Sequence, residues 1–158
     1  MKSCTVLAVV GVVASLAVLA QADKKGELMP RYIKHTLDCV KELKIDTAVC
    51  KEMMKEGNDN SQAKYDPCKC VVACVAKKAK VMTDAGEADM EKFTAAVDEF
   101  EIKEWSAEWV RVKPICEPAI KGKKDCVLGY DFFTCGYKES EIFRDVIKKF
   151  MGAMDGSS

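Results

Sequence analysis

The chain has 158 residues, with 25 basic and 25 acidic side chains and nine cysteines. This length fits one domain and leaves little room for a second. No cluster of basic residues alternates with aromatic ones, which argues against nucleic acid as a partner. The charges are spread along the chain in the manner typical of solvated helix faces.

The first 22 residues have the layout of a secretory signal peptide. Lys2 gives a basic start, residues 6–20 are almost entirely apolar, and Ala20-Gln21-Ala22 is a small-x-small cleavage site. The alternative is a transmembrane anchor, which needs about 20 apolar residues, whereas this run has about 15. We therefore expect a secreted, extracellular protein whose mature chain, residues 23–158, is one domain with a net charge of −1.

Apolar residues recur with helical spacing through the first half of the mature chain. The spacing predicts helices at residues 28–43, 47–56 and 67–82. The turn-forming run at 57–61 separates the second helix from the third. Asp66 is expected to cap the third helix, and Pro67 to occupy its first position, where a missing N–H costs nothing.

The second half predicts helices at residues 88–100, 102–112, 125–137 and 139–151, with disorder from Gly152 to the end. Pro114 and Pro118 should end or kink the helix that precedes them. The helix at 88–100 carries a clear apolar stripe, made of Met90, Phe93, Val97 and Phe100.

Eight cysteines remain once Cys4 leaves with the signal peptide, and an even number in a secreted chain predicts four disulfides. A zinc site is the rival interpretation. His35 is the only histidine and no C-x-x-C pair occurs, so we expect neither a metal nor a cofactor. Eight cysteines allow 105 connectivities, and the count alone does not choose among them.

Six of these cysteines have a spacing that resembles that of insect odorant-binding proteins, the pheromone- and general-odorant-binding family. Thirty residues separate the first from a C-x3-C pair, and intervals of 41, nine and eight residues follow; the six are Cys39, Cys70, Cys74, Cys116, Cys126 and Cys135. The resemblance covers essentially the whole mature chain, and six cysteines in register are far more specific than one C-x3-C.

The resemblance implies the pairs Cys39–Cys74, Cys70–Cys126 and Cys116–Cys135. Cys50 and Cys68 lie outside the six-cysteine pattern and most simply pair with each other. Such a bridge would stabilise the fold by about 3 kcal/mol through chain entropy. A reshuffled set, with Cys68 in the place of Cys70, is the alternative.

The resemblance also implies the fold: an all-α, compact, disulfide-stapled bundle of about six helices around an apolar pocket, followed by a C-terminal amphipathic helix. Four staples in a domain that could fold without them indicate incomplete packing somewhere, and a cavity would be that place. The expected ligand contacts have ordinary core as their alternative; they are Tyr32, Val81, Phe93, Val97, Trp105, Trp109, Val110 and Phe132.

The segment after the last cysteine is amphipathic and must bury its apolar face. We expect Phe143, Ile147 and Phe150 to form a lid on the pocket. Packing on the outside of the bundle, or a dimer face, is the alternative. Two hydroxyls, of Tyr32 and Tyr130, are candidates for a hydrogen bond to the ligand.

As a function, the resemblance implies a secreted carrier of small hydrophobic ligands, such as odorants or pheromones, in chemosensory lymph. A membrane odorant receptor would be an indirect partner, and the chain a monomer or weak homodimer. The alternative is a salivary, venom or haemolymph protein of the same fold that sequesters lipids, amines or host factors. An enzyme is not expected, because a lone histidine and the lack of a nucleophile elbow argue against a hydrolytic triad.

Overall fold

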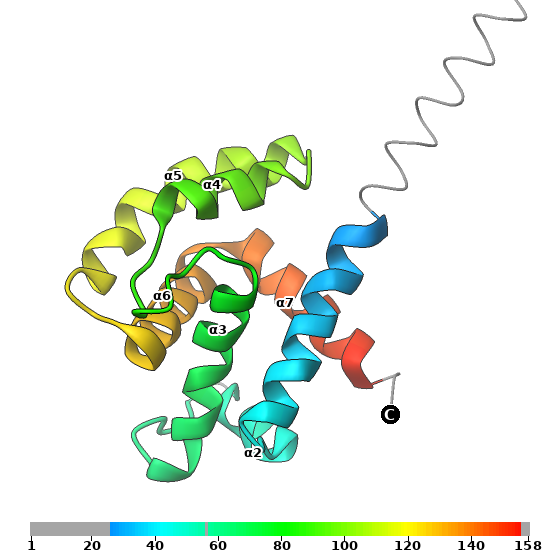
Figure 1. The fold of residues 1–158 in the computed structure, drawn as a ribbon, viewed down its shortest axis with the longest axis vertical. Helices are drawn as coiled ribbons and strands as arrows, with labels where there is room; N and C mark the ends of the chain where they lie inside the picture. The colour runs from blue at the N-terminus through cyan, green and yellow to red at the C-terminus, as the bar shows by residue number, and fades with distance from the viewer. Residues whose placement is uncertain (1–25, 56, 156–158) are drawn as a thin grey trace, which may run out of the picture. The chain divides into compact units, whose positions relative to one another are not determined.

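The computed structural model describes residues 26–55 and 57–155 (Figure 1). The chain divides into two units, Met1–Arg31 and Tyr32–Ser158. Residues 26–31 of the first unit are helical, and residues 32–42 of the second unit are helical. The expected signal peptide lies outside the described residues. Among the helices that the structure describes, none combines the length and the apolar character needed to cross a bilayer.

The second unit is built from helices joined by turns. They are α2 (Thr47–Met53), the short 3-10 helix η1 (Ala63–Tyr65), α3 (Asp66–Lys78), α4 (Met90–Asp98), α5 (Lys103–Ile120), α6 (Asp125–Glu139) and α7 (Glu141–Asp155). Figure 1 shows α4 alongside α5, and α3 against α6; among the helices named here, α3 and α6 share the most extensive contact. The predicted all-α, disulfide-stapled fold is confirmed.

Helix α5 continues past Pro114 and Pro118 to Ile120, so the expectation that they end the helix near residue 112 is wrong. Each proline removes the hydrogen bond to the carbonyl four residues before it. Pro114 and Pro118 both lie on the solvent face of α5, where water can satisfy the freed carbonyls. On the opposite face Val112, Cys116 and Ile120 are buried at every fourth position, and this burial holds the helix together.

Two further expectations about helix ends are wrong. Asp66 does not cap α3, because η1 leads directly into the helix and gives Asp66 a helical backbone; its carboxylate instead accepts a hydrogen bond from Lys69 Nζ at 2.8 Å. Helix α7 continues to Asp155, so residues 152–155 are helical rather than disordered, while residues 156–158 lie outside the described part.

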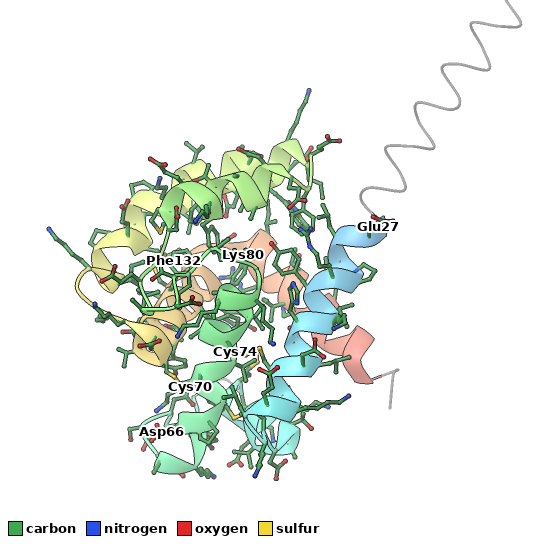
Figure 2. All side chains as sticks on the ribbon, viewed as in Figure 1. Glu27, Asp66, Cys70, Cys74, Lys80 and Phe132 are labelled. Carbon is green, nitrogen blue, oxygen red and sulfur yellow. A yellow bond between two sulfur atoms is a disulfide. The ribbon has the colours of Figure 1, made fainter. Side chains whose placement is uncertain are left out.

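Four disulfides join the helices: Cys39–Cys74, Cys50–Cys68, Cys70–Cys126 and Cys116–Cys135. The three pairs that the resemblance implies are present, together with the pair formed by the two remaining cysteines. In Figure 2, Cys70 and Cys74 are labelled on α3, the helix that is bridged to three different segments.

Buried side chains form two clusters, and each includes a residue of α3. The first cluster joins α3, α5 and α6 and contains Ala73, Met82, Ile120 and Leu128, with Phe132 packed against it. The second joins α2, η1 and α3 around Tyr65, which is fully buried. Tyr65 donates a hydrogen bond to Asn58, Asn58 donates to Asn60, and Asn60 donates to the hydroxyl of Tyr130. This polar chain ties the 57–62 turn to α6.

Candidate functional site

Three aromatic side chains from three helices meet on the inner side of α4, α5 and α6. Phe93 lies 4.6 Å from Trp109 and 5.0 Å from Phe132 between ring centroids, and Trp109 lies 5.9 Å from Phe132. We call these three residues the aromatic triad. Tilted and edge-on pairs at these distances are favourable for aromatic rings. Figure 2 labels Phe132 on α6, and its other side packs on the first buried cluster.

Helix α4 is positioned by its N-terminus. The Asp89 carboxylate accepts from the backbone N–H of Lys92 at 3.0 Å and so caps the helix. This hydrogen bond, and a second one from the Lys92 side chain, hold the pKa of Asp89 below its usual value. The backbone N–H of Asp89 donates to the carbonyl of Val81, so the buried Val81 sits directly beside the start of the helix that carries Phe93.

The only polar atom of the aromatic triad is the indole N–H of Trp109, and it has a partner. It donates to Thr94 Oγ1 at 2.9 Å, and the Thr94 hydroxyl donates in turn to the carbonyl of Met90 at 2.8 Å. Because Trp109 is 8% exposed, an unpaired N–H here would be costly. The polar groups of this site are therefore satisfied within the protein, and the rings present an apolar surface.

A second aromatic group continues this surface. Phe100 stacks on Tyr32 at 5.8 Å and lies 5.0 Å from Trp105, and His35 meets Tyr32 edge-on at 6.3 Å. Trp105 stands one turn before Trp109 on α5, about 6 Å along the helix. Phe100 was predicted as part of the apolar stripe but not as a ligand contact, although its spacing of seven residues from Phe93 was the available signal.

The structure brings most of the predicted contact residues to these two groups, but not all of them. Val97 is half-buried on α4, between Phe93 and Phe100 in the chain. Val110 is 72% exposed, so its expected inward orientation is wrong: the inner face of α5 is taken by Trp105, Trp109 and Val112. A side chain in solvent cannot line an enclosed apolar site.

The candidate lid residues lie on α7, and α7 packs on α6. Phe143 meets Phe133 edge-on at 5.6 Å, and Phe133 stacks on Tyr137 at 6.0 Å. Ile147 is half-buried, and the side chain of Phe150 lies outside the described residues. Tyr130 belongs to the other side of α6, where its ring packs on the second buried cluster and its hydroxyl accepts from Asn60.

Replacing Thr94 with valine is expected to lower the free energy of unfolding by about 1–3 kcal/mol, because the buried N–H of Trp109 loses its acceptor. Valine keeps the shape of threonine, so packing changes little. Urea denaturation of the oxidised protein measures the effect. Thr94→Ser keeps the hydroxyl and is the matched control; a valine variant no less stable than the serine variant would contradict the role assigned to this hydrogen bond.

The model of the PBP/GOBP family matches residues 21–139. No curated protein and no solved structure matches the chain significantly.

Proposed function

The chain belongs to the PBP/GOBP family, whose members bind small hydrophobic ligands, and we propose that it is a secreted carrier of odorants or pheromones. The observation that carries the proposal is the placement of two aromatic groups one turn apart along α5, at Trp105 and Trp109. Such a surface offers dispersion contacts to a small apolar molecule from several helices at once.

In this proposal the ligand lies against the aromatic triad and its continuation at Trp105. The contacts are the predicted set without Val110 and with Phe100 added: Tyr32, Val81, Phe93, Val97, Phe100, Trp105, Trp109 and Phe132. The ligand is neutral, because the Trp109 N–H and the Thr94 hydroxyl are already paired with each other. A carboxylate at the triad would give up its hydration without finding a donor there.

A pair of fluorescent probes tests the proposal. Anilinonaphthalene is neutral, and its sulfonate has the same rings with a negative charge. The mature protein is expected to bind the neutral probe saturably, and at least tenfold more tightly than the sulfonate, which corresponds to about 1.4 kcal/mol. Volatile alcohols, esters and terpenes are expected to displace the neutral probe.

The outcome of the displacement separates the two functional candidates. Displacement by volatiles supports a carrier of odorants or pheromones. Failure of every volatile and fatty acid to displace the probe contradicts the proposal and favours a secreted protein that recognises amines or host factors.

We further propose that α7 covers the ligand. Phe143 packs on α6, the helix that also carries Phe132, and Ile147 is half-buried on the same helix as Phe143. Both belong to the face that the sequence predicts to be apolar.

Ending the chain after Lys138 is expected to weaken binding of the neutral probe at least fivefold, since the ligand loses contacts on one side. Fluorescence titration measures the affinity, and far-ultraviolet circular dichroism checks that the other helices persist. If the truncated chain is folded and its affinity for the neutral probe is unchanged, the proposal that α7 covers the ligand is contradicted.

A further inference from the structure

The junction between α6 and α7 is a single buried serine. Ser140 is 3% exposed, and each of its hydrogen-bonding groups has a partner. Its backbone N–H donates to the carbonyl of Gly136, its carbonyl accepts from the N–H of Arg144, and its Oγ accepts from the N–H of Phe143. Ser140 therefore caps the end of α6 and the start of α7 at once.

Helix α5 reaches this junction with an ion pair. The guanidinium of Arg111 donates to both carboxylate oxygens of Glu108, at 2.9 and 2.7 Å, and to the backbone carbonyl of Glu139 at 2.6 Å. The Ser140 hydroxyl also helps to lower the pKa of the Glu108 carboxyl. An ion pair of α5 thus holds the carbonyl of the last residue of α6.

Helix α7 also binds the C-terminal end of α6, through Arg144. Arg144 Nη1 donates to the carbonyls of Tyr137 and Lys138, at 2.9 and 2.8 Å. These carbonyls belong to the last turn of α6, where carbonyl groups have no partner within the helix. A guanidinium near a helix C-terminus is favourable for this reason and for its charge.

We propose that Glu108 and Arg111 form a clamp on the α6–α7 junction, and that this clamp fixes the direction in which α7 leaves α6. Phe143 lies three residues beyond Ser140, and its ring rests on Phe133 and beside Gly136. A change of direction at Ser140 would lift that ring from α6, so the clamp decides where the apolar face of α7 lies.

The clamp is built to persist in mild acid. The charged groups at the junction are Glu108 and Arg111 from α5, Lys138 and Glu139 from α6, and Arg144 from α7. The Arg111 guanidinium and then the Ser140 hydroxyl lower the pKa of Glu108 to about 2. A lowered pKa stabilises the fold fully above the ordinary value of 4.5 and is lost as the pH falls towards 2, so the ion pair is intact at pH 5.

Hydrogen exchange of the α7 amides tests the clamp in the full mature chain, without any ligand. In Arg111→Ala, exchange across residues 141–149 is expected to be about tenfold faster than in the wild type, because the hydrogen bond from the charged guanidinium to the Glu139 carbonyl is lost. Glu108→Gln keeps the shape and loses the charge, so it should show a smaller increase. In the wild type, protection of α7 is expected to be equal at pH 7 and pH 5 after correction for intrinsic exchange.

Two references make the result decisive. Lys123→Met breaks the ion pair between Lys123, which precedes α6, and Asp131, in the first half of α6. Because neither residue belongs to the α6–α7 junction, exchange of the α7 amides should stay as in the wild type. The amides of α3 report global stability and should exchange as in the wild type. The clamp is overturned if α7 exchange is unchanged in Arg111→Ala, if α3 and α7 accelerate together, or if wild-type α7 opens between pH 7 and pH 5. None of these outcomes depends on whether the protein carries odorants.

Discussion

Replacing Gly129 with alanine is expected to lower the free energy of unfolding by about 3 kcal/mol, the upper end of the range for overpacking a core. Gly129 is buried where α6 crosses α3. A Cβ at this position would lie 2.8 Å from the backbone nitrogen and 3.1 Å from the Cα of Ala73. Backbone atoms cannot rotate away as a side chain can, and the Cys70–Cys126 disulfide one turn earlier joins the same two helices. The helices therefore have to separate or distort.

The matched control is Gly152→Ala, since Gly152 lies within α7 and its Cβ would meet nothing within 4 Å. Alanine is the better helix former by about 1 kcal/mol, so this variant should be neutral or slightly more stable. Urea denaturation with the disulfides intact gives both values. If the two variants were equally stable, the crossing of α3 and α6 would have space for a methyl group at Gly129, which would contradict the prediction.

Replacing Phe132 with leucine is expected to weaken binding of neutral anilinonaphthalene about tenfold, because two ring contacts of about 0.5–1.5 kcal/mol each define the triad surface. Leucine keeps the position apolar, and the fold should survive. Fluorescence titration measures the affinity, and urea denaturation of the same sample shows how far stability has changed.

An exposed residue of the same helix provides the control. Val127 lies on α6 with its side chain 58% exposed, so it does not contribute to the triad. Val127→Ala should change the probe affinity by less than about threefold, or 0.7 kcal/mol. Equal loss of affinity in both variants would argue that the ligand does not lie at the triad.

Much of the fold could be predicted because the features that specify it are local. The stripe of Met90, Phe93 and Val97 marks the inner face of α4, and the apolar segment after Cys135 becomes α7 as its spacing indicates. The prediction that α5 ends at its prolines was wrong. It considered only the backbone hydrogen bonds that a proline removes, and not the face of the helix on which the proline lies. Only packing shows that both prolines face solvent.

The candidate site was predicted in part, for a related reason. Trp105 and Trp109 are one turn apart, and their common face follows from the helical period. Val110 was misplaced because an apolar residue next to a buried one need not be buried itself. The pairing of Trp109 with Thr94, and of Arg111 with the carbonyl of Glu139, crosses from one helix to another, and no spacing within a single helix encodes such partners.

Both tryptophans of the chain belong to the aromatic groups described above. Its intrinsic tryptophan emission therefore comes from the candidate site alone, without a background from elsewhere in the protein. Trp109 is buried and hydrogen-bonded, whereas Trp105 is only half-buried, so the two should emit at different wavelengths. Quenching of the bluer or the redder component would locate an unlabelled ligand along α5 without any added dye.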